Sequence, residues 1–207
     1  MIVQEIKEYL KEKDPKLATL IDSVTLPELK SNDVYFDLIE SIVSQQLSVK
    51  AATTIHNRFL ELFTTKYPYP EFVEALDLEE MRGVGLSYQK ANYIKNTAVF
   101  WEEHQLLDKD WATLTDDEII KLLSEIKGVG KWTVQMILMF TLQRTDVLPV
   151  DDLGIQQGMY MLYDLDKENI RNLKKQMEAT AEAWRPYRSV VSRYIWRYKD
   201  TVKSTKY

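Results

Sequence analysis

The 207-residue chain has no cysteine and only two histidines. The absence of cysteine excludes disulfide bonds, zinc sites with thiolate ligands and iron–sulfur clusters held by cysteines. His56 and His104 fall in helical patterns without an evident partner, and we assign them no role. We therefore expect no metal site.

Long hydrophobic runs are also missing. No stretch of about 18 apolar residues occurs, so the sequence predicts no membrane span. The opening segment, MIVQEIKEYLKEKD, lacks the basic, apolar and small-residue parts of a secretory signal peptide. We expect an intracellular protein, in the cytoplasm or nucleoid of a bacterium or archaeon or in the nucleus of a eukaryote. Hydrophobic residues make up 45% of the chain, which can supply the core of one domain or of two small lobes.

Positive charge is scarce overall. The formal net charge of −5 weighs mildly against nucleic-acid binding. Basic residues nevertheless concentrate near the C-terminus, where residues 184–207 contain seven Lys and Arg against one Asp. A solvated helix with a basic tail explains this segment more simply than a DNA-binding surface does.

The alternation typical of β-strands is absent, and apolar residues recur instead at helical spacing. One apolar stripe runs from Val34 to Val43 and a second from Ala51 to Phe63, with Gln45-Gln46-Leu47-Ser48 between them. Ser48 suits the N-cap of the second helix. Thr115 and Glu118 form a capping box ahead of another stripe. We predict an all-α protein of roughly nine or ten helices joined by short loops.

The most informative segment is the turn Gly128-Val129-Gly130, which joins two helical patterns. Glycines bring the backbone close to a ligand, and the N-terminus of the next helix offers N–H groups to an anion such as phosphate. Twenty-two positions after Gly130, an acidic pair ending at Asp152 opens another helix. A phosphate-binding turn and a carboxylate at this separation suggest an enzyme that acts on a nucleic-acid backbone. A glycine turn can also serve helix geometry alone, and Asp152 can cap its helix while taking part in catalysis.

These segments resemble a known family. The sequence LLSEIKGVGKWTVQMI followed by LPVDDLGI is similar to the helix-hairpin-helix motif and catalytic loop of the HhH-GPD DNA glycosylases, with the 3-methyladenine DNA glycosylase II (AlkA/MAG-like) branch as the nearest match. IVSQQLSVKAA at 42–52 and WRPYRSVVSRYIW at 184–196 also resemble that branch, so the likeness spans roughly 33–198. The chain departs from the pattern in lacking the β-rich N-terminal extension of some members and in having Lys127 where many have proline.

The resemblance implies a single HhH-GPD module over 1–207 with two helical lobes. One lobe covers about 33–143 and includes the helix-hairpin-helix at 116–143; the other covers about 1–32 plus 144–207. The glycine turn and Asp152 are expected to face a cleft between the lobes. Asp152 is the implied catalytic acid. Its role is chemically reasonable, because breaking an N-glycosidic bond builds positive charge on the sugar, which a carboxylate stabilises.

Residue 132 indicates the subtype. Family members that also cut the DNA strand have a lysine at this position as a Schiff-base nucleophile. This chain has Trp132, and the side chain of the adjacent Lys131 points about 100° away around the helix. We therefore predict a glycosylase without strand-cleaving (AP lyase) activity.

The resemblance also implies the residues that bind the substrate. Trp132 and Trp196 would flank a base lifted from the duplex, with Met136 and Tyr35 completing the base pocket. Trp196 lies on the polar side of the last amphipathic helix, which a contact with the other lobe also explains. The expected DNA-binding residues are those of the turn and of the junction at 45–48: Gly128, Val129, Gly130, Lys131, Thr133, Gln46 and Leu47. Leu47 would enter the vacated stack; alternatively, it is a hydrophobic staple for the following helix.

The sequence thus predicts a monofunctional DNA glycosylase that removes alkylated purines, such as 3-methyladenine or 7-methylguanine, from double-stranded DNA. We expect a monomer without membrane contact or organic cofactor, although carbonyls of the turn can bind a monovalent cation. Three alternatives stay open: a glycosylase of the same fold for deaminated or oxidised bases, a non-catalytic helix-hairpin-helix module that binds DNA structure, and an acidic helical scaffold that binds protein.

Overall fold

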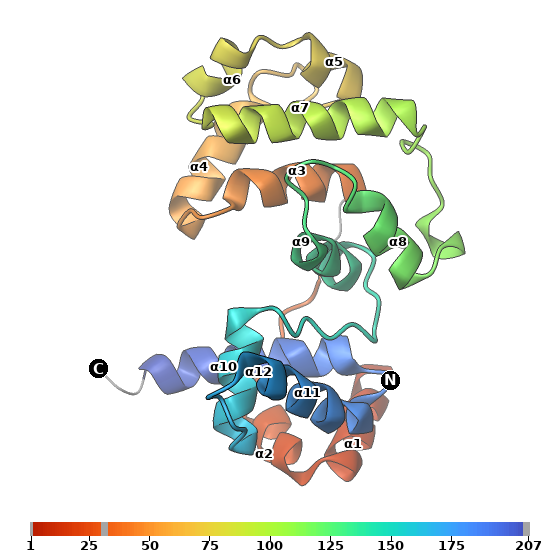
Figure 1. Cartoon of the computed structure of the whole chain (residues 1–207), viewed down its shortest axis with the longest axis vertical. Helices are drawn as coiled ribbons and strands as arrows, with labels where there is room; N and C mark the ends of the chain where they lie inside the picture. The colour runs from red at the N-terminus through yellow and green to blue at the C-terminus, as the bar shows by residue number, and fades with distance from the viewer. Residues whose placement is uncertain (1, 30–32, 205–207) are drawn as a thin grey trace. The chain divides into compact units, whose positions relative to one another are not determined.

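The computed structural model describes residues 2–29 and 33–204, and every regular element in these ranges is a helix (Figure 1). The predicted all-α fold class is confirmed. The chain forms two compact units: unit 1 comprises Met1–Leu29 and Gln143–Tyr207, and unit 2 comprises Lys30–Leu142. None of the described helices combines the length and apolar character that a membrane span requires.

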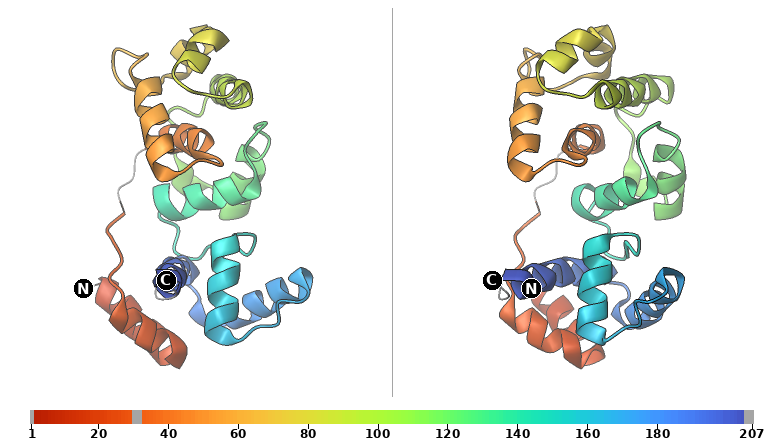
Figure 2. Two further views of the ribbon diagram at one scale, coloured as in Figure 1. Left: turned by 90° about the vertical axis from the view of Figure 1, so that its left-hand side faces the viewer. Right: turned by 60° about the vertical axis from the view of Figure 1, so that its left-hand side comes forward.

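Unit 2 is built around α3, whose apolar stripe is buried. Its α-helices are α3 (Val34–Ser44), α4 (Val49–Leu60), α5 (Pro70–Ala75), α6 (Leu78–Gly83), α7 (Tyr88–Glu103), α8 (Asp116–Leu123) and α9 (Lys131–Met136). A 3-10 turn at Trp111–Thr113 precedes α8. Helix α3 packs against both α4 and α7, and Figure 2 shows these three helices side by side. The buried residues of α3 are those that the helical period predicts: Val34, Tyr35, Leu38, Ile39, Ile42 and Val43.

Local signals fix where several of these helices begin. The Ser48 hydroxyl accepts a hydrogen bond from the Ala51 N–H at 3.4 Å and so caps α4. Thr115 and Glu118 form both bonds of a capping box at the start of α8. Both caps were predicted from the sequence and are confirmed. Each satisfies N–H groups that the first helical turn leaves without an intrahelical partner.

The second helix of the hairpin contains a feature that its sequence does not predict. Helix α9 continues without a break into a π-helical segment, Ile137–Thr141, where the Leu142 N–H donates to the Ile137 carbonyl at 3.0 Å. A π turn inserts one residue into the helical repeat and is often found at functional sites. The inserted residue changes which side chains share a face, so a strict 3.6-residue period misplaces residues after Met136.

Unit 1 joins the two ends of the chain around a buried tryptophan. Its helices are α1 (Ile2–Lys13), α2 (Pro15–Ser23), α10 (Leu153–Tyr163), α11 (Ile170–Ala181) and α12 (Arg188–Ser204), with a 3-10 turn at Glu182–Trp184. The Trp184 indole is fully buried and donates to the Asp14 carboxylate at 2.9 Å. Asp14 also accepts from the Tyr163 hydroxyl at 2.7 Å and caps α2. This buried carboxylate therefore links α2, α10 and the approach to α12.

The basic segment near the C-terminus largely serves unit 1 itself. Asp146 binds Arg185 and Arg188 at 2.6 Å each, through different carboxylate oxygens. Arg193 donates to the Pro27 carbonyl. These contacts support the structural interpretation of the segment, because three of its arginines are engaged within the unit.

Candidate active site and DNA-binding residues

Asp152 directly precedes α10 and is its N-cap, as the sequence predicts. Its Oδ1 accepts a hydrogen bond from the Ile155 N–H at 2.8 Å. The same oxygen accepts a second bond from the Trp196 indole Nε1, also at 2.8 Å. Two donors on one oxygen fix the orientation of the carboxylate.

Trp196 reaches Asp152 because α10 and α12 pack closely. A Cβ atom on Gly154 would lie 2.9 Å from the Trp196 ring and 3.0 Å from Asp152 Oδ1. One turn later, a Cβ on Gly158 would lie 2.4 Å from Ile195. The absence of a side chain at Gly154 admits the indole, and its absence at Gly158 lets α12 approach closely at Ile195. The sequence placed Trp196 on the polar side of its helix but did not identify this hydrogen bond; the Gly-x-x-x-Gly spacing in α10 was the available signal.

The neighbouring acid, Asp151, has a different environment. Its carboxylate is exposed and forms an ion pair with Lys174 at 2.6 Å. Asp152, by contrast, is partly buried and held by backbone and indole donors. This difference supports the choice of Asp152 over Asp151 as the candidate catalytic acid.

The two glycines of the hairpin turn have different roles: Gly128 is required by its backbone and its packing, and Gly130 leaves open space. Gly128 has φ +104°, and a Cβ there would lie 2.3 Å from the Tyr93 ring of α7. Gly130 is exposed, and a Cβ atom added there would have no protein atom within 4 Å. The backbone of a ligand can therefore approach it. The side chains of Val129 and Thr133 are 5% exposed each, and only their main chain is available for the predicted DNA contact.

Unit 2 contains a pocket of about 630 Å³ between α3 and the second helix of the hairpin. Its lining consists of Asp37, Glu40, Ser41, Ser44, Gln45, Gln46, Trp132, Met136, Ile137, Phe140 and Thr141. Trp132 is 44% exposed, which is unusual for a tryptophan in a small domain. Two predicted base-pocket residues, Trp132 and Met136, therefore line one cavity.

Tyr35 does not take part in this pocket. It is 1% exposed, and its ring lies 5.2 Å from that of Trp101 in the core of unit 2. Its hydroxyl has no hydrogen-bond partner among the described residues, and burial raises its pKa. The predicted role for Tyr35 in base binding does not fit this placement, because the residue belongs to the buried stripe of α3 and not to its polar side.

Two acids of the pocket were not identified from the sequence. Asp37 Oδ2 accepts from the Thr141 hydroxyl at 2.6 Å, and Glu40 Oε1 lies 3.7 Å from His56 Nδ1. Burial, with a smaller contribution from Asp37, raises the pKa of Glu40, and burial lowers the pKa of His56. The signal was present: Asp37, Glu40, Ser41 and Ser44 repeat at helical spacing opposite the apolar stripe.

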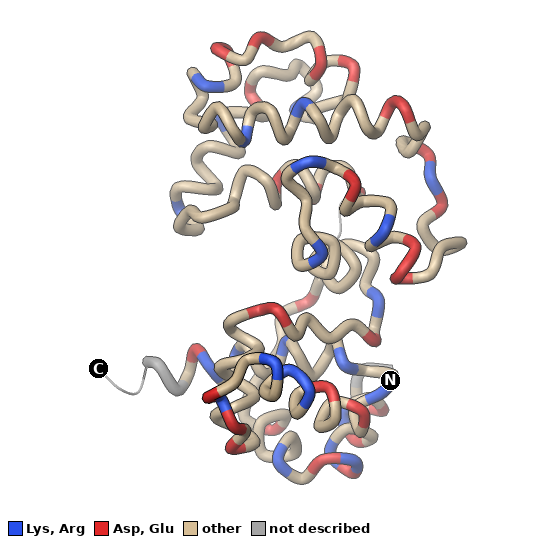
Figure 3. Tube along the Cα trace, viewed as in Figure 1, with Lys and Arg blue, Asp and Glu red and all other residues tan. Residues whose placement is uncertain are grey.

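Charge is unevenly spread over unit 2. Figure 3 shows acidic residues gathered along α5 and α6, where Glu71, Glu74, Asp77, Glu79 and Glu80 are all exposed. This surface does not suit a polyanion. Lys131, at the start of the hairpin's second helix, is exposed, as is Lys50 in the first turn of α4. Lys131 is one of the predicted DNA-binding residues, and Lys50 follows the predicted junction at 45–48 by two positions.

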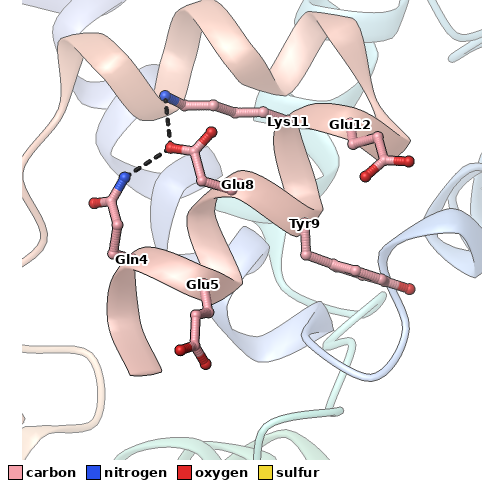
Figure 4. Close-up of a pocket in the computed structure, with 6 residues that line it drawn as sticks. All are labelled: Gln4, Glu5, Glu8, Tyr9, Lys11 and Glu12. Carbon is pink, nitrogen blue, oxygen red and sulfur yellow. Dashed lines mark hydrogen bonds and ion pairs between the residues drawn. The ribbon is translucent and has the colours of Figure 1, made fainter. Parts of the chain in front are cut away.

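A second hollow lies along α1 in unit 1 and is shown in Figure 4. Glu8 accepts from Gln4 Nε2 at 2.7 Å and forms an ion pair with Lys11 at 3.6 Å. Glu5 and Glu12 add further negative charge to its lining. Such a surface suits neither DNA nor a phosphate. Within the described ranges, no group of three His, Asp or Glu side chains is placed to hold a metal ion.

Comparison with known proteins identifies the family. Residues 39–186 match the HhH-GPD superfamily base excision DNA repair protein profile, which covers more than half of the chain. The chain belongs to the HhH-GPD superfamily. The family predicted from the sequence is therefore confirmed, and the glycine turn and Asp152 both lie inside the matched range.

Relatives and solved structures of this superfamily point to the same branch. The chain is 35% identical over 180 residues to DNA-3-methyladenine glycosylase 1 of Schizosaccharomyces pombe, covering 86% of this chain and 78% of that protein. It is 33% identical to the putative DNA-3-methyladenine glycosylase YfjP of Bacillus subtilis, covering 83% of this chain and 61% of that protein.

Two solved structures superpose well on this HhH-GPD protein. One is the S. pombe 3-methyladenine DNA glycosylase Mag1 in complex with abasic DNA, with a TM-score of 0.81 and 33% identity, covering 93% of this chain and 95% of that chain. The other is a DNA-3-methyladenine glycosidase from Bacillus halodurans, with a TM-score of 0.83 and 31% identity, covering 95% and 90%.

Proposed function

We propose that this HhH-GPD protein is a monofunctional DNA glycosylase that excises alkylated purines of the 3-methyladenine and 7-methylguanine type from duplex DNA in base excision repair. The observation that carries the alkylated-base specificity is the pocket of unit 2, where an exposed indole stands with two carboxylates. Alkylation at N3 or N7 makes a purine a flat cation. A flat cation suits an aromatic face and nearby negative charge better than a neutral base does.

The apolar and the acidic side chains of the pocket contribute different interactions to binding of the base. Trp132 offers an aromatic face, and Met136 and Phe140 add polarisable and aromatic surface. Stacking of a cation on an indole is worth about 0.5–2 kcal/mol, which a neutral base largely forgoes. Asp37 and Glu40 add electrostatic attraction for the same positive charge.

Asp152 acts on the sugar. When the C1′–N bond breaks, its electron pair moves to the alkylated base, which leaves neutral, and positive charge develops on the deoxyribose. The Asp152 carboxylate stabilises this charge. Water then bonds to C1′ and loses a proton, which leaves the free base and an abasic site. No acid has to protonate the departing base, because it already carries positive charge.

The remaining assignments are also proposals. The main chain at Gly128–Gly130 and the side chain of Lys131 bind the phosphate backbone, and Gln46 and Leu47 contact the duplex beside the lesion. The protein acts as a monomer without an organic cofactor. Stacking of the base on Trp196 and a monovalent cation at the turn stay predictions from the family resemblance.

Glu40→Gln is expected to slow single-turnover excision of 7-methylguanine about tenfold, because it removes negative charge from the pocket while keeping its shape. The dissociation constant for a duplex with an abasic site should not change, since that DNA carries no cationic base. Glu103→Gln, at the exposed end of α7, is the matched control and should match the wild type on both measurements. If Glu40→Gln weakened binding to abasic DNA by the same factor as it slowed excision, the assigned role would be contradicted.

Borohydride treatment during incubation with abasic duplex DNA should trap no covalent protein–DNA complex. Trp132 cannot form the Schiff base that such trapping reduces. Denaturing electrophoresis reads the result, with a glycosylase that uses a catalytic lysine as the positive control. A trapped band that runs with this protein would show strand-cleaving chemistry and refute the monofunctional assignment.

A panel of duplexes, each with one lesion, separates the proposal from its alternatives. We expect release of 7-methylguanine and 3-methyladenine in preference to hypoxanthine, uracil and 8-oxoguanine. Preferential release of a deaminated or oxidised base would favour the glycosylase of another specificity. Tight binding without release of any base would favour a non-catalytic DNA-structure-binding module.

A further inference from the structure

The loop between α3 and α4, residues 45–48, exposes apolar side chains at its tip. Leu47 is 39% exposed, and Val49, the first residue of α4, is 84% exposed. Gln46 has φ +59°, a left-handed conformation that is uncommon outside glycine. An exposed apolar tip on a loop with a left-handed residue suits insertion between bases, and its use depends on how firmly the loop is held.

Lys90 holds this loop from the neighbouring helix α7. Its Nζ donates to the Val43 carbonyl at 2.7 Å and to the Gln45 carbonyl at 2.6 Å. These carbonyls belong to the C-terminal turn of α3 and to its C-cap, which lack partners within the helix. The ammonium group also stands at the negative end of the helix dipole, where a cation is favourable. Burial lowers the pKa of Lys90.

Gln45 joins the same loop to the hairpin turn. Its side-chain Nε2 donates to the Gly128 carbonyl at 3.2 Å, across a sequence separation of 83 residues. Gly128 is itself fixed against the Tyr93 ring of α7. The main chain of the loop is therefore bound by Lys90, and the Gln45 side chain is bound to the turn. Helix α7 contacts both the loop and the turn.

We propose that Lys90 and Gln45 are positioning residues that lock the α3–α4 loop to the hairpin turn, so that the exposed apolar tip enters the duplex at a fixed distance from the phosphates bound by the turn. This inference rests on the proposed glycosylase function. Neither residue touches the reacting atoms in this role. Both act through Leu47 and Gly128.

The positioning role predicts that the excision rate depends on whether the damaged base is paired. Opening a base pair and unstacking the base costs a few kcal/mol, and the cost is smallest when the base is mismatched or unpaired. A loosely held loop offsets less of this free energy when its tip enters the duplex. Loss of Lys90 should therefore slow excision from a fully paired duplex much more than excision of the same lesion from a bulge or mismatch.

Lys90→Met keeps the aliphatic stem and removes the two hydrogen bonds. We expect single-turnover excision of 7-methylguanine to fall about tenfold in a paired duplex and less than threefold when the lesion is mismatched. Lys95→Met is the matched control, because Lys95 lies on the same helix and donates to the Glu74 carbonyl of α5 at 2.8 Å. This control should leave the rate on both substrates unchanged. Equal slowing on both substrates in Lys90→Met, or no slowing, would overturn the proposal.

A second variant and a second measurement keep the test decisive. Gln45→Met removes the bond to Gly128 without touching the lysine, and it should show the same dependence on pairing; it carries the test if Lys90→Met does not fold. Amide hydrogen exchange measures how firmly the loop is held and does not depend on catalytic activity. The amides of residues 44–48 should exchange faster in both variants than in Lys95→Met. If the wild type releases no base, the proposed function fails, whereas unchanged exchange in both variants would defeat the positioning role by itself.

Discussion

Asp152→Asn is expected to lower the single-turnover rate of base release by at least about 10²–10³-fold, the loss typical of removing one electrostatic stabiliser of a transition state. Asparagine is isosteric with aspartate and is an equally good N-cap. Its Oδ1 can still accept from the Ile155 N–H and from the Trp196 indole, so the local structure should persist. The rate is measured as release of 7-methylguanine from a duplex by excess enzyme.

Asp151→Asn is the matched control for this experiment. Its carboxylate lies at the surface, and a surface ion pair such as that with Lys174 contributes about 0–1 kcal/mol to stability. This control should keep nearly the wild-type rate, and both variants should keep the wild-type melting temperature and affinity for abasic DNA. Full activity in Asp152→Asn would remove the aspartate from the mechanism.

Gly128→Ala is expected to destabilise the fold by about 2–5 kcal/mol, which combines a left-handed backbone with an overpacked contact. The added Cβ would lie 2.3 Å from the Tyr93 ring, and φ is +104°. For a chain of this size, the melting temperature should fall by roughly 5–15 °C. Differential scanning calorimetry measures the change.

Two other glycines separate folding from binding in this test. Gly83→Ala introduces a Cβ with no atom within 4 Å and should leave the melting temperature unchanged or slightly higher. Gly130→Ala also meets no protein atom and should melt like the wild type while binding DNA more weakly, because its methyl group occupies the space proposed for the phosphate backbone. A Gly128→Ala variant with native stability would contradict the packing role of the turn.

The fold class and the family could be predicted because their signals are local. The apolar stripe of α3, the Ser48 cap and the capping box at Thr115 each depend on residues a few positions apart. The N-cap position of Asp152 is of the same kind, since it follows from the acid before an apolar helical pattern. Such patterns can be identified without knowledge of tertiary contacts.

The parts of the site that escaped prediction depend on contacts between distant segments. The bond from Trp196 to Asp152 joins residues 44 positions apart, and the bond from Gln45 to Gly128 joins residues 83 apart. The π-helical segment, whose Ile137 and Thr141 line the pocket, is also not visible in a regular helical period. Tyr35 illustrates the converse: the family resemblance implied a base contact, but its position in the apolar stripe of α3 already indicated burial.

The most direct test of the glycosylase assignment is to incubate the protein with methylated double-stranded DNA and to identify the released compounds by chromatography. We predict free 3-methyladenine and 7-methylguanine, with an intact strand that breaks only on later alkaline treatment, and no release by Asp152→Asn. Methylated DNA that is bound but retains every base, or that loses nucleotides in place of free bases, would contradict the account.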